Sequence, residues 1–407
     1  MHWLIAATLL AAAEPAAPAA QPAVDPELEE EIAKELGAPL PPRAPAPDST
    51  AGQGAQGGGE APAAQGQPAA GGNPLARLLL LPDISAIGDF AGAYDTADVA
   101  GLSPRSGPYG DAHKVTPLFQ ELELGLQSVI DPYARADIFL SFTPDGVDVE
   151  EAYLTTLSLP AGFQVRAGKF FSPFGRLNQQ HPHVWDFVDA PLAMDRLLSA
   201  DTLKGPGADV AWLAPLPWYA ELHLAGQTTR PGFLAEDRRT LVARLQQFFD
   251  VSEGTTVGVG LSGASIEEPL PGASDLVGGA DLFLKLRPVT SRSYVALQGE
   301  VFVRRLRGTA DAGTRAGGYV QAVYRDGPFW EYGVRGEIAP AVLPGTTLAP
   351  SGSGEEYRCS ALAVWLPSEF QRIRAQLAWD RLPGGRDGLE ALLQLEFVIG
   401  SHGAHPF

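Results

Sequence analysis

From residue 81 onward, apolar and polar residues alternate in short runs separated by Gly, Pro and Asp. In 389–400 one face carries leucines, Phe397 and Ile399, and the other carries Glu390 and Glu396. A period of two is typical of a strand with one apolar and one polar face. The pattern predicts about sixteen strands. They are 82–95, 117–130, 132–143, 149–159, 162–171, 204–214, 217–228, 238–249, 255–264, 275–287, 292–305, 315–325, 329–339, 355–366, 371–380 and 389–400.

Most of these strands are long enough to cross a bilayer at a tilt, which takes about nine to eleven residues. Short turns alternate along the chain with mostly longer loops, the longest being 172–203. This alternation is typical of outer-membrane barrels, whose short turns face the periplasm. Aromatic residues near strand ends on the apolar face fit membrane-interface belts: Trp212, Trp365, Trp379 and Phe397.

We therefore predict an all-β fold, a transmembrane antiparallel β-barrel over 81–407 with short periplasmic turns and long outer loops. A soluble β-sandwich or β-helix is the alternative, because a sandwich with its apolar faces inside gives the same alternation. An uninterrupted series of strands of this length and number would, however, be large for a sandwich.

Residues 1–20 are expected to be a signal peptide. A short apolar run is followed by the A-x-A-like sites Ala11-Ala12-Ala13 and Ala17-Pro18-Ala19. Because no Lys or Arg precedes the apolar run, a disordered Ala/Pro tail is the alternative. No later run is apolar for the eighteen or more residues that indicate a transmembrane helix.

Two further segments precede the barrel. Residues 21–37 predict a short helix, since acidic residues begin it and Gly37 ends it. Residues 38–80 are rich in Ala, Pro, Gly and Gln and predict a disordered linker. An even number of strands places both ends of a barrel on one side, so we expect this N-terminal segment in the periplasm and the barrel in the cell outer membrane.

Composition excludes several classes of protein. A net charge of −19 argues against nucleic acid as a partner, because phosphate binding needs clustered Lys and Arg. One cysteine, Cys359, rules out an internal disulfide. Hydrolase and NTPase motifs such as G-x-S-x-G, H-E-x-x-H and the P-loop are absent from the sequence, so we predict neither an enzyme nor a cofactor. A barrel enzyme or an adhesin is the alternative of another class.

Several motifs resemble a known family. Gly168-Lys169-Phe170-Phe171-Ser172-Pro173-Phe174-Gly175 resembles the GKF-x-x-PFG segment of porins related to the phosphate-selective porin O and P family. Three further segments are similar to parts of porin-like proteins, some of which are labelled zinc-regulated outer-membrane receptors. These are 82–90, 181–183 and 187–192.

The resemblance implies sixteen strands, homotrimeric assembly and a third long loop folded into the lumen as a constriction. The third long loop here is 172–203. The resemblance also implies that a C-terminal aromatic, here Phe407, is the signal that the barrel-assembly machinery reads.

Candidate pore residues follow from this placement. The expected constriction combines both signs of charge: Arg166, Lys169, Arg176, Asp186, Asp189 and Arg196. The inferred lumen faces of the strands also carry both signs of charge. The residues are Glu121, Glu123, Arg135, Lys285, Glu300, Arg304, Arg335, Arg372 and Arg374. A lumen of both signs selects weakly by charge. The alternative is that these charges pair with one another and hold the barrel wall rigid.

No metal site is predicted. His181 and His183 are weak candidates, because two imidazoles alone fall short of the three or four protein ligands of a zinc site. The sequence thus predicts a porin-like channel in outer-membrane lipid, for passive diffusion of small hydrophilic solutes or ions with weak charge selectivity. The alternative is a zinc-linked or anion (phosphate)-specific channel.

Overall fold

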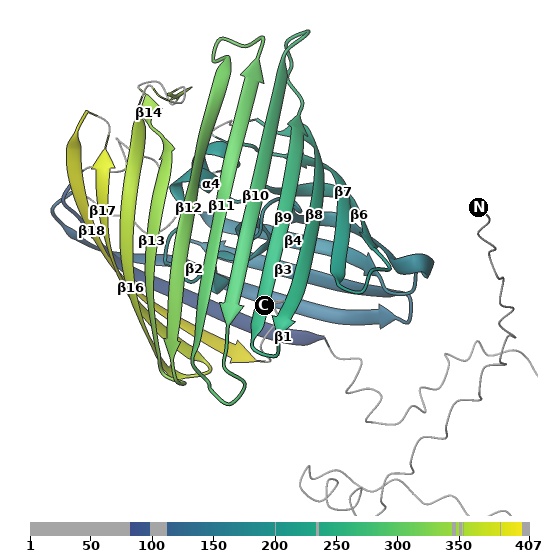
Figure 1. Ribbon diagram of the computed structural model, residues 1–407, viewed down its shortest axis with the longest axis horizontal. Coiled ribbons are helices and arrows are strands. Elements are labelled where there is room, and N and C mark those ends of the chain that lie inside the picture. The colour runs from purple at the N-terminus through teal and green to yellow at the C-terminus, as the bar shows by residue number, and fades with distance from the viewer. Residues whose placement is uncertain are drawn as a thin grey trace, which may run out of the picture. The chain divides into compact units, whose positions relative to one another are not determined.

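In the computed structural model, the described residues form a closed antiparallel barrel of sixteen strands (Figure 1). The structure describes residues 82–97, 112–199, 201–232, 236–343, 347–349, 352, 354–382 and 384–400. Each strand pairs with its neighbours along the chain, and β1 pairs with β18 to close the sheet. The predicted fold class is confirmed.

The strand boundaries lie close to the predicted ones. The barrel strands are β1 (Asp83–Asp95), β2 (Val115–Asp131), β3 (Ala134–Thr143), β4 (Gly146–Thr156), β5 (Phe163–Phe171), β6 (Lys204–Leu213), β7 (Tyr219–Thr229), β8 (Arg238–Ser252), β9 (Thr255–Ile266), β10 (Ser274–Leu286), β11 (Tyr294–Arg307), β12 (Gly313–Asp326), β13 (Trp330–Pro340), β16 (Glu355–Ser368), β17 (Gln371–Leu382) and β18 (Arg386–Gly400). A small separate hairpin, β14 (Val342–Leu343) with β15 (Thr347–Leu348), lies in the connection between β13 and β16.

Strand β4 departs most from its predicted range of 149–159. It begins at Gly146, so the predicted loop 144–148 shrinks to a tight turn. Its pairing with β3 contains a β-bulge, because Phe139 lies opposite Glu151 and Leu140 lies opposite Val149. The extra residue, Glu150, places two consecutive side chains on the buried side and breaks the period of two. Alternation alone therefore located this strand but shifted its bounds by three residues.

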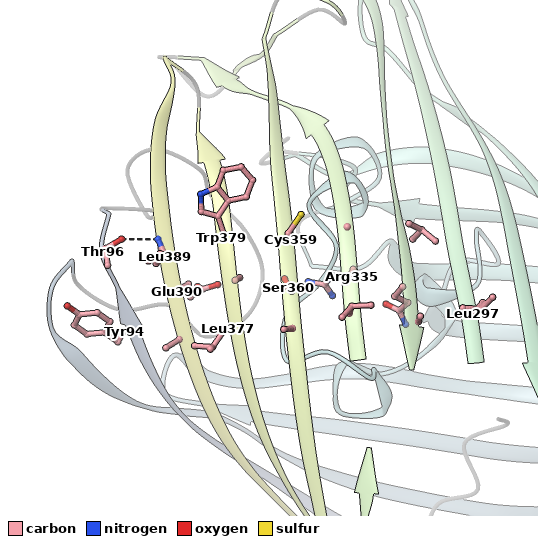
Figure 2. A pocket seen from close by; sticks show the side chains of 18 residues that line it. Tyr94, Thr96, Leu297, Arg335, Cys359, Ser360, Leu377, Trp379, Leu389 and Glu390 are labelled. Carbon is pink, nitrogen blue, oxygen red and sulfur yellow. Dashed lines mark hydrogen bonds between the residues drawn. The ribbon is translucent and has the colours of Figure 1, made fainter. Parts of the chain in front are cut away.

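The apolar face of the barrel points outward. On β11, Val301 and Val303 are 56% and 46% exposed, whereas Glu300 and Arg304 are only 2% and 5% exposed. Large apolar residues on the outside and charges on the inside reverse the distribution of a water-soluble protein. Figure 2 shows a hollow of this outer face, lined by side chains such as Cys359, Leu377 and Trp379. A soluble sandwich is therefore excluded.

Aromatic pairs mark the edge of the barrel that carries the short turns. Phe163 at the start of β5 stacks on Trp212 near the end of β6, with ring centroids 6.3 Å apart. Trp330 and Trp365 stack at 6.3 Å across β13 and β16. Such a girdle is expected where strands leave the apolar core of a bilayer.

The described residues contain no helix that is both long and apolar enough to cross a membrane. The predicted signal peptide (1–20), short helix (21–37), linker (38–80) and assembly signal Phe407 lie outside the described residues.

Candidate functional site

We call the connection between β5 and β6, residues 172–203, the lumen segment; its described residues, 172–199 and 201–203, run through the inside of the barrel. It contains two short 3₁₀ helices, Leu177–Gln179 and Pro182–Val184, and the helix α4 (Leu192–Leu197). Its hydrogen-bond partners come from strands all around the closed sheet, so the segment occupies the lumen. They are Glu123 on β2, Glu151 on β4, Gln227 on β7, Ser262 on β9, Glu300 on β11, Glu337 on β13 and Gln376 on β17.

A buried carboxylate fixes the start of the lumen segment. Glu300 accepts hydrogen bonds from the backbone N–H groups of Arg176 at 2.9 Å and Leu177 at 2.8 Å. The Tyr319 hydroxyl donates to the same carboxylate at 2.8 Å. Gly175 has a φ of 61°, and a Cβ there would lie 2.3 Å from Glu300. Glycine therefore permits the close approach between segment and wall.

The centre of the lumen segment packs as an apolar core inside the barrel. Phe174 stacks on Phe302 of β11 with ring centroids 6.2 Å apart, and α4 lies against β11, β12 and β13. Full burial of one large apolar side chain contributes about 1.5–3 kcal/mol. The segment is therefore held firmly in the lumen by several such residues at once: Phe174, Leu177, Leu192, Met194, Leu197 and Leu198.

Ion pairs join the second half of the segment to the wall of β13–β18. Asp189 contacts Arg335 at 2.6 Å and Arg358 at 2.8 Å. Arg358 also contacts Asp380 at 2.8 Å and pairs with Glu390. Removing one partner of these ion pairs would leave a buried charge without compensation, which is strongly unfavourable.

The predicted constriction residues all lie in or at the base of this arrangement. Arg196 pairs with Glu356 at 2.8 Å, and Asp186 accepts a hydrogen bond from Gln321 at 2.8 Å. The guanidinium of Arg176 stacks over the Phe283 ring at 4.0 Å.

The two predicted residues on β5 are held by the wall. Arg166 lies 3.4 Å from Asp209, and Lys169 lies 3.0 Å from Asp148. Within the described residues, no ion pair joins the four predicted cations to Asp186 or Asp189, and Asp189 pairs with the wall arginines instead.

The predicted lumen charges of the strands are largely paired. Arg304 contacts Asp275 at 2.6 Å, and Arg135 contacts Asp137 at 2.5 Å. Lys285 lies over the Tyr294 ring at 4.6 Å. Two of the three arginines of β17 bind the lumen segment through its carbonyl groups: Arg372 donates to His183, and Arg374 donates to Trp185 at 2.5 Å.

A cavity of about 310 Å³ adjoins the lumen segment on the short-turn side of the barrel. Its lining includes the aromatic residues Phe283 and Tyr294. Burial raises the pKa of Asp186, which also lines the cavity, above its usual range. Charged residues of both signs line it: Arg176, Arg325, Arg372, Asp186, Glu331, Glu369 and Glu396.

The sequence prediction named His181, His183 and Glu123 separately but did not bring them together in one cluster. His181 of the lumen segment contacts Glu123 at 2.7 Å through Nδ1 and Glu151 at 2.9 Å through Nε2. Burial opposes a charge on His181, but Glu123, Glu150 and Glu151 outweigh it and raise the pKa of the imidazole well above its usual range. The signal in the sequence was weak, because the partners depend on an inward path of the lumen segment and on the bulge in β4.

An outward apolar face, a charged interior and a long connection folded into a sixteen-stranded barrel define the fold class of the outer-membrane porins. Solved structures with this fold include an anion-selective porin from Comamonas acidovorans, with a TM-score of 0.54 and 10% identity over 78% of this chain and 99% of that chain. OprB of Pseudomonas putida has a TM-score of 0.54 and 11% identity, covering 78% and 94%. The channel DcaP of Acinetobacter baumannii has a TM-score of 0.54 and 12% identity, covering 78% and 97%.

No protein-family model matches the chain. The chain belongs to the same family as an uncharacterized protein of Aquifex aeolicus (strain VF5), to which it is 32% identical over an alignment of 390 residues. The alignment covers 82% of each of the two proteins.

Proposed function

We propose that this protein is an outer-membrane channel through which small hydrophilic solutes or ions diffuse passively. The observation that carries the proposal is the lumen segment, because it narrows a barrel whose outside is apolar and whose inside is charged. Its apolar core fills part of the lumen, so the passage is narrow. We take the cavity on the short-turn side to be part of this passage.

Weak charge selectivity is the second part of the proposal. The cavity presents arginine, aspartate and glutamate side chains together, and most of them have a partner of opposite sign. Arg325 contacts Glu331 at 2.6 Å, and Arg372 contacts Glu396 at 2.5 Å. A lumen with both signs creates a transverse field and excludes neither cations nor anions.

An anion (phosphate)-specific channel, as in the porin O and P family, is the second candidate. It would rely on Arg372 and Arg374, which already donate to carbonyl groups of the lumen segment and to Glu396. These arginines are thus engaged in holding the segment, and this favours the weakly selective channel. Homotrimeric assembly and a periplasmic N-terminal segment complete the proposal.

A reversal-potential measurement tests the selectivity. The purified protein in a planar bilayer, under a salt gradient, should give a cation/anion permeability ratio near unity that phosphate does not change. Strong block by phosphate that is lost in Arg372→Gln and Arg374→Gln would favour the anion-specific channel instead. Arg381→Gln, a substitution of an exposed arginine on the same strand, is the matched control.

A further inference from the structure

The strongest unassigned site lies where the lumen segment meets β2 and β4. Two imidazoles of the segment, His181 and His183, lie beside the carboxylate of Glu123 on β2. The Nδ1 atoms of His181 and His183 are 2.7 Å and 3.5 Å from Glu123 Oε2. One donor atom from each of these residues lies within 4.8 Å of the others, and all three residues are buried. Glu150 of β4 lies 3.2 Å from the same Nδ1 atom of His181, and Glu151 lies 2.9 Å from Nε2 on the other side of the ring.

Two β-bulges bring the carboxylates together. The bulge in β4 lets the consecutive residues Glu150 and Glu151 both point inward, where each is 4% exposed. A second bulge, in β2, lies beside Glu121, which precedes Glu123 on the lumen face. Bulges redirect side chains in this way and are frequent beside functional sites.

The site holds more negative charge than its lysine and arginine partners offset. Among the described lysines and arginines, Lys204 is the one that forms an ion pair with a carboxylate of the site, at 3.1 Å from Glu150. The Oε1 atom of Glu121 is buried and, in this part of the structure, lacks a hydrogen-bond partner. A buried excess of carboxylates is unfavourable unless protons or a cation compensate it.

The imidazole of His181 is held in a fixed position. The ring of Phe139 lies 4.7 Å from it and the ring of Phe171 lies 4.8 Å from it. A ligand whose orientation is fixed by packing loses little freedom when it binds a metal.

We propose that His181, His183 and Glu123 bind one divalent metal cation, with Glu150 and Glu151 as neighbouring carboxylates. Imidazole nitrogen together with carboxylate oxygen suits a cation of the zinc type, whereas calcium and magnesium prefer oxygen ligands alone. Tetrahedral bonds of about 2.0–2.1 Å place donor atoms about 3.3 Å apart, which the spacings in this cluster approach. A neutral imidazole is needed for ligation, so binding releases the proton that His181 shares with the carboxylates.

Such a cation would join the lumen segment to the wall at β2, whereas Asp189 joins it to the wall at β16 through Arg358. The inference goes beyond the proposed function, because it adds a metal site to a passive channel. It does not depend on conductance, since metal binding is measured on the folded protein in detergent.

Isothermal titration of the full chain with zinc chloride tests the site, with magnesium chloride as the comparison cation. We expect one zinc ion per chain and no comparable magnesium binding. His183→Ala and Glu123→Gln should each weaken zinc binding about tenfold or more. His223→Gln is the matched control, because His223 is another histidine of the barrel interior and pairs with Asp209 at 3.0 Å, outside the cluster.

Absence of zinc binding by the unaltered chain would overturn the proposal. Equal binding by His183→Ala, Glu123→Gln and the control would also overturn it, because the metal would then bind elsewhere. Circular dichroism checks that each variant retains its barrel, and Glu123→Gln keeps the shape of the side chain it replaces. A channel that conducts but binds no zinc would leave the proposed function intact.

Discussion

Arg358 forms several buried ion pairs, and the alternation of apolar and polar residues in the sequence does not predict their partners. Its guanidinium is fully buried among carboxylates of β13, β17, β18 and the lumen segment. The sequence pattern placed such charges on the inner face, because period two fixes the face of every residue. It could not give their partners, since Asp189 reaches Arg358 only through the path of the lumen segment.

Replacing this arginine should be costly. We expect Arg358→Met to lower the free energy of unfolding by about 3–5 kcal/mol, because Asp380, Glu390 and Asp189 lose a shared cation. Denaturant unfolding of the barrel in detergent measures the change. Arg381→Met is the matched control on β17, and loss of its exposed pair with Asp387 should cost about 0–1 kcal/mol. Equal effects of the two substitutions would contradict the structural role of the buried network.

The lumen segment is the element that narrows the interior of the barrel. Its length and position could be predicted, since it follows a recognisable motif at 168–175. The apolar residues within it do not recur at a regular spacing, because they pack against eight or more residues on different strands of the wall. The pattern therefore could not predict that the segment runs inward. The hairpin of β14 and β15 escaped prediction for a similar reason, since two-residue strands are too short to show alternation.

The start of the segment offers a test at this scale. Glu300→Ala removes the acceptor of two consecutive backbone N–H groups and of the Tyr319 hydroxyl. We expect a looser segment, seen as greater open-channel current noise and faster proteolysis within 172–203. Glu267→Ala, at an exposed glutamate that pairs with Arg239, should change neither. Identical proteolysis of both variants would mean that Glu300 does not anchor the segment.

For the whole molecule, the exposed apolar surface indicates that lipid surrounds the barrel. Cys359 is the one cysteine of the chain and lies on the outward face of β16, in the hollow shown in Figure 2. Its neighbours there include Leu377 and Trp379 of β17. An outward face of this composition is stable against lipid and would aggregate in water.

A nitroxide attached to Cys359 reports this environment. In liposomes we expect it to collide with oxygen, which dissolves in lipid, and to be shielded from a water-soluble nickel complex. The comparison is the double variant Leu270→Cys, Cys359→Ala, in which the nitroxide is attached at position 270, an exposed position in the connection between β9 and β10. There we expect collisions with the nickel complex and little contact with oxygen dissolved in lipid. Free access of the nickel complex to position 359 would contradict a membrane-facing outer surface.

The central claim is that the barrel conducts and that the lumen segment narrows its passage. The most direct measurement compares single-channel conductance of the full chain with that of a chain lacking 178–198, in planar bilayers. We predict small ohmic openings for the full chain, and larger openings with less solute preference after the deletion. Deletion of 268–272, in an exposed connection, should leave conductance unchanged. A full chain that inserts but never conducts, or a conductance that the deletion of 178–198 does not raise, would contradict the account.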